Sequence, residues 1–173
     1  MTKKVKNFEF IEKYIRKMTF GILTTVDKNG IPHSTGMLYG VSPPGAKFCL
    51  YCITEDNYKK VRNIKENPHV AFAIPYPHHL LRFVPSSCIQ FSGTAELKPS
   101  DDSEGRNAFS ANTILKSNLK EVDKGEIPID KVVFIKIKPE KKIFCYGVGI
   151  SLMKLARDHG SGMYSVEIPP ERL

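Results

Sequence analysis

The spacing of apolar residues predicts one helix followed mainly by strands. At the start of the chain, apolar residues recur every three or four positions and form one helical face from Phe8, Ile11, Ile15 and Met18. Two β-branched runs, at 20–26 and 33–41, flank Asp-Lys-Asn-Gly, a turn sequence that favours an antiparallel hairpin. Further strands are predicted at 47–53, 70–74, 87–97, 131–138 and 142–147.

Two more helices interrupt these strands. Thr54 is predicted to cap a helix that Asn67-Pro68 ends, and an acidic segment at 100–104 opens a second helix running to about residue 122. The fold class expected is mainly β (α+β), with six or seven antiparallel strands in a small β-barrel with peripheral helices. The length of 173 residues fits a single domain, 1–173, in which the tail at 150–173 has the least regular pattern.

Composition narrows the class of protein. Hydrophobic residues make up 41% of the chain, which is enough for a packed core, and no stretch reaches the roughly 18 apolar residues of a membrane span. The first ten residues reach charge before any apolar run, so we expect no signal peptide, a cytoplasmic location and no membrane partner. The four cysteines are therefore expected to be reduced thiols.

Few residues suggest chemistry by protein side chains alone. Cys49 and Cys52 form Cys-x-x-Cys, but residues three apart on a strand face opposite ways, so we expect buried thiols and no metal site. The pair His78-His79 is either a haem or metal ligand or a solvated loop pair. Asp101-Asp102 reads as the first turn of a helix. Nucleophile-elbow, Walker and zinc-protease motifs are missing from the sequence, which favours chemistry carried by a cofactor.

The segment ITEDNYKKVRNI at 53–64 has the clearest binding signature. A strand ends, Thr54 supplies a hydroxyl, and Lys59, Lys60 and Arg62 follow within about one helical turn. Such a cluster can neutralise a phosphate, although a solvated basic helix face has the same spacing. Acidic residues interleave with these bases, and no helix-turn-helix or RNP-like pattern accompanies them, so we expect no nucleic-acid partner.

The order of motifs resembles the FMN-binding split barrel of pyridoxamine 5'-phosphate oxidase and its small relatives. The resemblance rests on FGILTTVDKNGIPHSTGMLYGV, KFCLYCITEDNYKKVRNIKENPHVAFAI and SCIQFSGTAEL, and it continues in KVVFIKIKPEKKIFCYGVG. It implies an FMN-dependent oxidoreductase acting on an unidentified small molecule. It also implies a homodimer with the flavin between the two subunits.

The resemblance also implies which residues contact the flavin. They come from the second strand, the end of the third, the basic helix and a later strand: Ser34, Thr35, Gly36, Met37, Leu38, Ile53, Thr54, Lys59, Lys60, Arg62, Cys88 and Gln90. Cys88 occupies the position at which relatives often carry a flavin-contacting glutamine, and Gln90 lies two residues on, on the same strand face. The oxidase has an arginine and a lysine where this chain has Thr35 and Gly40.

Other functions remain open on the sequence. Without recognisable catalytic acids or bases, the chain could store flavin or sense redox state without turnover. The same barrel could hold haem or a deazaflavin (F420). The C-terminal segment KLARDH matches the oxidase's substrate motif only loosely, so the tail could instead cover the partner's flavin or serve a substrate unrelated to vitamin B6.

The net charge of +8 at first suggests a polyanionic partner. Its distribution changes this interpretation, because residues 1–20 carry six bases and two acids, and residues 131–142 carry five bases and one acid. The segment with the proposed phosphate ligands is nearly balanced. We therefore expect most of the excess charge to be solvated surface and the bound anion to be a single flavin phosphate.

Overall fold

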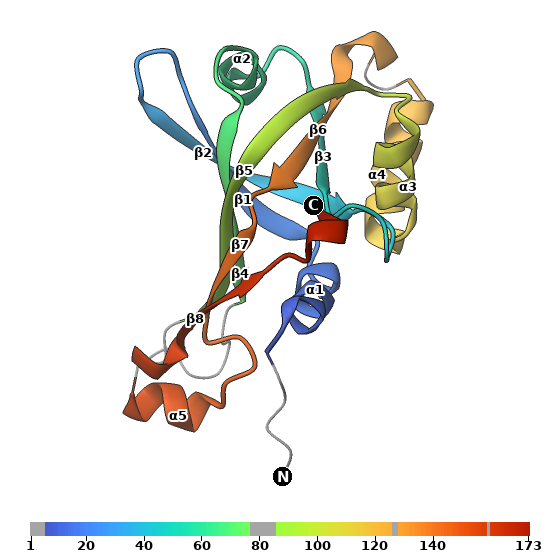
Figure 1. Ribbon diagram of the computed structural model, residues 1–173. Helices are drawn as coiled ribbons and strands as arrows, with labels where there is room; N and C mark the ends of the chain where they lie inside the picture. Colours follow the sequence, from blue (N-terminus) through green and yellow to red (C-terminus); the bar gives the residue numbers. More distant parts are fainter. Residues whose placement is uncertain (1–5, 77–85, 126–127, 159) are drawn as a thin grey trace.

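A computed structural model describes residues 6–76, 86–125, 128–158 and 160–173 and shows an antiparallel β-barrel with helices around it (Figure 1). Within these ranges the eight strands are β1 (Phe20–Val26), β2 (Pro32–Val41), β3 (Leu50–Glu55), β4 (His69–Tyr76), β5 (Ser87–Pro99), β6 (Val132–Pro139), β7 (Lys142–Tyr146) and β8 (Met163–Glu167). This confirms the predicted fold class.

Six of the strands close the barrel. Their order is β4-β1-β2-β3-β6-β5, and β5 pairs again with β4 over eight residue pairs, from His69↔Thr94 to Tyr76↔Ser87. The long β5 also pairs with β7, and β7 pairs with β8, so the sheet extends beyond the barrel. Closure removes the open edges that strand pairing between molecules would otherwise use.

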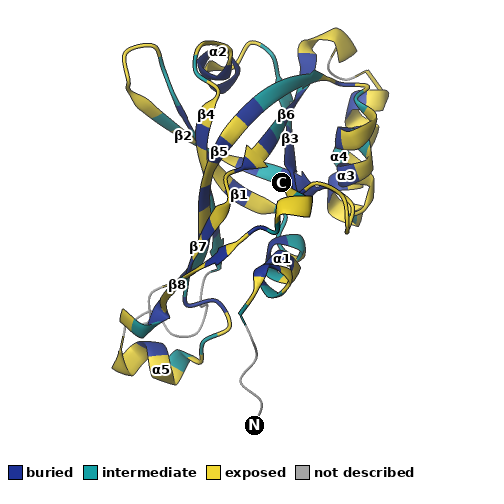
Figure 2. Cartoon of the chain, in the orientation of Figure 1, coloured by how far each residue is buried: buried dark blue, intermediate teal, exposed yellow. Residues whose placement is uncertain are grey.

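The core has two parts (Figure 2). Alternate residues of the strands fill the barrel, including Leu23, Leu50, Phe72 and Ile135, all fully or almost fully buried. A second cluster lies outside β3 and β6. There α3 (Ser103–Ser110) and α4 (Thr113–Asp123) cover the sheet with Ala108, Phe109, Leu115 and Leu119.

The helices α1 (Phe8–Lys17) and α2 (Lys59–Glu66) lie at opposite ends of the barrel (Figure 1). The face of α1 predicted from the sequence packs into the barrel core through Phe8, Ile11 and Ile15. At the other end, Ile64 of α2 joins the same core. Each helix buries one apolar stripe, which stabilises helices this short, and each also buries one charged residue, Glu12 in α1 and Lys60 in α2.

The third strand and the second helix differ from the sequence prediction. β3 begins at Leu50 instead of Lys47, because the Phe48 amide donates to the Arg172 carbonyl and the Cys49 amide to the Ser42 hydroxyl. At its other end β3 continues to Glu55, which pairs with Val132 of β6. The prediction that Thr54 caps α2 was therefore wrong, and the helix begins after Tyr58.

The predicted helix from 100 to 122 is two helices. α3 ends at Ser110, and the Asn112 side chain caps α4 by accepting from the amides of Ile114 and Leu115. A helix break lets both short helices bury an apolar face on the curved sheet. The tail also has structure, since α5 (Leu152–Arg157) precedes β8 and a 3-10 turn follows it at Pro170–Arg172.

The four cysteines are free, and the Cys-x-x-Cys pair is divided between the two parts of the core. Cys52 lies inside the barrel and Cys49 lies under α3, which confirms that their thiols face opposite sides of the strand. Burial raises the pKa of Cys49 and raises that of Cys52 to about 12. Both thiols are consequently neutral at physiological pH.

Candidate functional site

The barrel opens along one strand boundary. β2 and β3 pair only over Tyr39↔Cys52, Gly40↔Tyr51 and Val41↔Leu50, whereas β2 pairs with β1 over seven residues down to Pro32. Beyond Tyr39, the two strands therefore diverge, and β3 stays paired with β6 on its other side. We call the gap between residues 34–38 of β2 and residues 53–54 of β3 the split.

The helix α2 stands at the end of the split and is attached to both sides. On the β1–β2 side, the Asn63 side chain donates to the Thr25 hydroxyl (2.9 Å), and Lys59 lies 3.7 Å from Asp27. On the β3 side, the Lys60 ammonium donates to the Thr54 hydroxyl (3.2 Å). These contacts hold the helix where its basic residues meet the diverging strands.

Lys60 has an unusual environment. The residue is 7% exposed, and its ammonium lies 4.3 Å from the centre of the Tyr58 ring. Among the described residues no carboxylate forms an ion pair with it. Burial lowers the pKa of Lys60, and the nearby Glu55 opposes that shift. A buried cation with only neutral contacts is costly, and an anion bound beside it would remove that cost.

The other two basic residues of the predicted phosphate cluster point elsewhere. Lys59 is partly exposed and faces Asp27 of the β1–β2 turn. Arg62 is exposed and donates to the carbonyl of Asn57, in the loop before the helix. Lys60 and Arg62 are about 160° apart around the helix at about 100° per residue, so within one chain the three side chains do not converge.

On β2, the predicted site residues offer mainly backbone to the split. Ser34 bonds to Thr24 on the outside of the sheet (2.8 Å), and Thr35 lies 3.4 Å from a ring nitrogen of His33. Met37 packs inside the barrel and Leu38 packs against the α3–α4 cluster. Ile53 of β3 also packs against that cluster. The next residue, Thr54, places its hydroxyl at the split, where it bonds to Lys60.

Gly40 departs from the oxidase pattern for a steric reason. A Cβ placed there would lie 2.7 Å from the carbonyl carbon and oxygen of Ala108 in α3. No lysine fits at this position while α3 packs on β2. The lysine of the oxidase pattern therefore has no counterpart here, and Lys60 is a buried cation beside the split.

Cys88 and Gln90 lie on the outside of β5, as their spacing predicts, with Ile89 buried between them. They belong to β5, which pairs with β4, β6 and β7, whereas Thr54 belongs to β3. Gln90 belongs instead to a row of paired residues that crosses six strands, from β2 to β8: Gly36, Ile22, Ala73, Gln90, Phe144 and Ser165.

We call this side of the sheet the outer face. It carries several large exposed apolar side chains, among them Phe20, Ile22, Phe144 and Met163. Two hollows of about 340 and 470 Å³ lie on it, and Gln90 and Phe144 line both. A cluster of exposed apolar side chains of this kind is typical of a protein interface.

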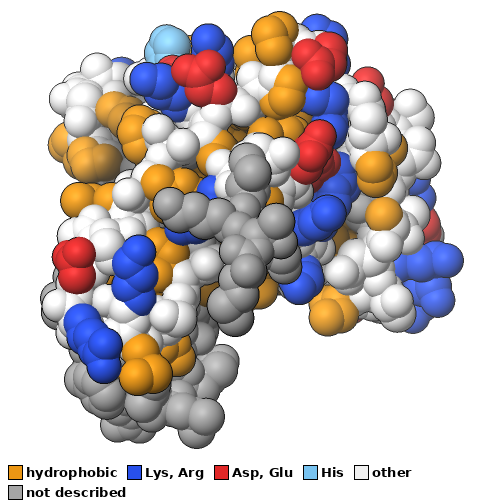
Figure 3. Space-filling model, turned by 60° about the horizontal axis from the view of Figure 1, so that its bottom comes forward, with side chains coloured by type: hydrophobic (Ala, Val, Ile, Leu, Met, Phe, Trp, Pro, Cys, Tyr) orange, Lys and Arg blue, Asp and Glu red, His pale blue; other side chains and the backbone are white. Residues whose placement is uncertain are grey.

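Charge on the molecule is dispersed. Figure 3 shows Lys and Arg side chains in several separate places on one face, with Asp and Glu beside many of them. Surface ion pairs such as Lys138–Glu96 and Lys141–Glu167, both at 2.9 Å, account for part of this mixture. The pattern agrees with a largely solvated charge excess.

Metal ligands do not gather in the described part of the chain, where no group of three or more His, Cys, Asp or Glu is placed to hold an ion. His78-His79 lies outside the described residues. Asp102 caps α3 by accepting from the Gly105 amide (2.8 Å), as expected for the first turn of a helix. In the described ranges, no helix combines the length and the hydropathy that a membrane-spanning helix requires.

The family model for pyridoxamine 5'-phosphate oxidase matches residues 8–145. The chain belongs to this family. A comparison with curated proteins gives no match.

Solved structures share the family fold. The haem storage protein HutZ from Vibrio cholerae is 16% identical, with a TM-score of 0.63 over 83% of this chain and 96% of that one. General Stress Protein 26 from Bacillus anthracis is 28% identical, with a TM-score of 0.57 over 79% of this chain and 91% of that one. A haem binding protein from Mycobacterium smegmatis is 17% identical, with a TM-score of 0.68 over 96% of this chain but only 60% of its own.

Proposed function

We propose that this member of the family binds FMN in the split and acts, as a homodimer, as a flavin-dependent oxidoreductase on a small molecule. The observation that carries the proposal is Lys60, a buried ammonium without an acidic partner in the described chain. It stands where Thr54 and the diverging strands meet. A flavin phosphate there would receive a charge-assisted hydrogen bond from Lys60 and a second bond from the Thr54 hydroxyl.

The rest of the split suits the flavin ring. Isoalloxazine is flat and largely apolar, with hydrogen-bonding groups on its edge, and a strand edge offers matching backbone donors and acceptors. Bound flavin would supply the electron-transfer chemistry, which needs no nucleophile from the protein. The residues of the chain would hold the phosphate, orient the ring and keep water away from it.

The outer face supports the homodimer. Its apolar residues need cover, and it carries Gln90 and Cys88 of β5, whereas Lys60 is on α2 and bonds to Thr54 of β3. If two chains associate through their outer faces, Gln90 of the partner subunit can approach the flavin held in the split. This arrangement unites all the strand segments expected to contact the cofactor.

Absorbance spectroscopy tests the proposal. Protein purified with flavin bands, or gaining them after FMN is added and the excess removed, supports FMN binding. Colourless protein that gains no flavin absorbance contradicts it, and tighter binding of a deazaflavin than of FMN contradicts the choice of cofactor. Steady-state NAD(P)H consumption with an added acceptor supports turnover, whereas flavin binding without turnover supports storage or redox sensing instead.

Haem is the second candidate. It is favoured by the solved structures of HutZ and of the Mycobacterium smegmatis protein, which carry haem functions in their names and share this fold. In the described part of the chain, the histidines are His33, half-buried on β2, and His69, exposed at the start of β4. A Soret band that saturates at one haem per chain, with no flavin binding, would indicate that the cofactor is haem and not FMN.

A further inference from the structure

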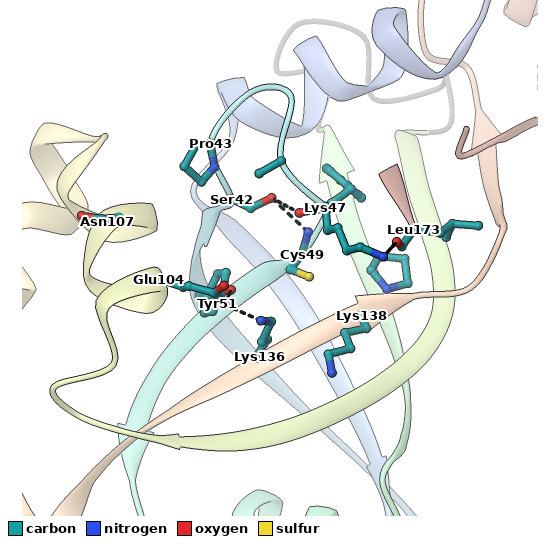
Figure 4. A pocket seen from close by; sticks show the side chains of 13 residues that line it. Ser42, Pro43, Lys47, Cys49, Tyr51, Glu104, Asn107, Lys136, Lys138 and Leu173 are labelled. Carbon is teal, nitrogen blue, oxygen red and sulfur yellow. Dashed lines mark hydrogen bonds and ion pairs between the residues drawn. The ribbon is translucent and has the colours of Figure 1, made fainter. Parts of the chain in front are cut away.

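A separate cavity of about 530 Å³ lies at the other end of β3, and none of its lining residues belongs to the predicted flavin site (Figure 4). It is enclosed by the β2–β3 loop, strands β3 and β6, helix α3 and the C-terminal turn. Ligand pockets for small molecules commonly have volumes of about 300–1,000 Å³. The cavity is therefore large enough for a small organic molecule.

The walls of this cavity are held by hydrogen bonds within the chain. The Ser42 hydroxyl donates to the Lys47 carbonyl (2.8 Å) and accepts from the Cys49 amide (3.1 Å). The Phe48 amide donates to the Arg172 carbonyl (2.6 Å), and the Arg172 guanidinium binds Glu12 of α1 (2.9 Å). The loop and the C-terminal turn are thus fixed to the barrel, and the cavity exists before any ligand binds.

Most of the lining is apolar. Pro43, Ala46 and Pro139 form part of the walls, and the Cys49 thiol and the Tyr51 ring form the floor. Burial raises the pKa of the Cys49 thiol, so this part of the floor carries no charge at neutral pH. A ligand with an apolar body would gain free energy by displacing water from these surfaces.

Polar groups meet at one side of the cavity. The Tyr51 hydroxyl donates to Glu104 Oε2 (2.7 Å), and the Lys136 ammonium bonds to the same oxygen (Figure 4). The Lys136 side chain is 14% exposed, whereas Glu104 is 60% exposed at the rim. An ammonium has three donors, and among the described residues only Glu104 accepts one, so Lys136 keeps donors for a ligand.

The charge of the lining favours an anion. Three lysines, at positions 47, 136 and 138, line the cavity with a single glutamate, Glu104, so the lining side chains have a net charge of +2. Lys138 is paired with Glu96 outside the lining (2.9 Å), and Lys47 is bonded to the Leu173 carbonyl. Lys136 is therefore the cation best placed to receive a negatively charged group.

We propose that this cavity binds a small organic anion with an apolar body, its acidic group on Lys136 and its body on the Cys49–Tyr51 floor. This site is independent of the flavin site. Carboxylate and phosphate groups share the chemistry that Lys136 recognises, and the experiment below distinguishes them. The absence of flavin binding would not contradict ligand binding in this cavity, because the two sites share no residue.

Titration of ¹⁵N-labelled full-length protein with octanoate tests the proposal by NMR. The expected result is saturable shifts of amides at 42, 45–51, 104–107 and 136–138. Octyl phosphate, octanol and octylamine serve as parallel probes. Saturable binding of octanoate or octyl phosphate at these amides supports the proposal, and the tighter of the two identifies the acidic group. Octanol or octylamine binding as tightly as both anions overturns it.

Two pairs of variants locate the site. Asn107→Trp fills the cavity from an exposed position on α3 and should abolish the octanoate shifts, whereas Ser110→Trp, one turn on and outside the lining, should preserve them. Lys136→Met should weaken octanoate binding about tenfold, while Lys98→Met, a lysine outside the lining, should not. Shifts that survive Asn107→Trp, or no saturable shifts in the wild type, overturn the proposal.

Discussion

Replacing Lys60 with methionine should change stability and flavin affinity in opposite directions. Methionine keeps the length and apolar stem of the side chain but removes the buried charge. Without ligand, the variant loses a hydrogen bond to Thr54 and a cation–π contact with Tyr58, each worth about 1 kcal/mol, and gains relief from an unpaired buried ammonium that costs several kcal/mol. We therefore expect the ligand-free variant to be at least as stable as the wild type.

For FMN binding, the same substitution is expected to be unfavourable. A hydrogen bond from a charged donor contributes about 1.5–3 kcal/mol, so Lys60→Met should weaken FMN binding by roughly 10- to 100-fold. Lys59→Met is the matched control, because Lys59 is adjacent in sequence but partly exposed and directed at Asp27. It should change FMN affinity less than about threefold.

Two measurements complete this comparison. Quenching of flavin fluorescence gives the dissociation constant of each variant, and urea unfolding of the ligand-free proteins gives the free energy of unfolding. A Lys60→Met variant that loses several kcal/mol of stability and keeps its FMN affinity would show that Lys60 does not bind the flavin phosphate. Lys60 would then be a structural residue, and the phosphate site would have to be sought elsewhere.

Three further substitutions test the Glu12 ion pairs, the packing of α3 on β2 and the dimer interface. Glu12→Gln should lower the free energy of unfolding by about 3 kcal/mol at neutral pH, since Glu12 is 7% exposed and binds two arginines. Those arginines hold the pKa of Glu12 below its ordinary value despite burial, so its stabilisation is present above that value and disappears as pH falls through the folded-state pKa. Urea unfolding measured from pH 7 to 3 should show that the free energy of unfolding falls less steeply with decreasing pH in the variant than in the wild type. Equal slopes for the two proteins would contradict this role of Glu12. Gly40→Val should displace α3, lowering the melting temperature, because its Cβ would meet the Ala108 carbonyl at 2.7 Å, and unchanged melting would contradict that packing. Phe144→Glu should convert a dimer to monomers in sedimentation and weaken FMN binding, whereas a dimer that survives it would exclude the outer face.

Much of the fold follows from local sequence patterns. The helix at Phe8–Lys17 and the hairpin of β1 and β2 were predictable, because apolar periodicity and an Asn-Gly turn are short-range signals. The end of β3 was not, since Thr54 and Glu55 remain extended by pairing with Val133 and Val132, about 80 residues later in the chain. The local sequence therefore predicts a helix cap at Thr54, whereas pairing with β6 keeps that residue in the strand.

The site was predictable by segment but not by side chain. The sequence gathers Lys59, Lys60 and Arg62 into one helical turn, yet only the direction of each side chain separates the buried cation from the two exposed ones. The 100° step of a helix already indicates that neighbouring lysines face different sides, and this signal could have singled out one of them.

The second cavity had no sequence signal. Its polar groups, Tyr51, Glu104 and Lys136, come from two strands and a helix that are far apart in the chain. In the sequence, Glu104 belongs to an acidic helix start, and Lys136 belongs to a basic segment expected to be solvated. Only the packing of α3 on β3 and β6 brings them together, and such packing depends on the whole fold.

Comparing the binding of FMN and of riboflavin to the wild-type protein tests whether the split holds the flavin phosphate. Riboflavin has the same ring system but lacks the phosphate that is expected to meet Lys60 and Thr54. Equilibrium titrations should show that FMN binds about tenfold more tightly or better, the effect of one charge-assisted hydrogen bond or more. Equal dissociation constants for the two flavins would contradict a phosphate site at Lys60 in the split.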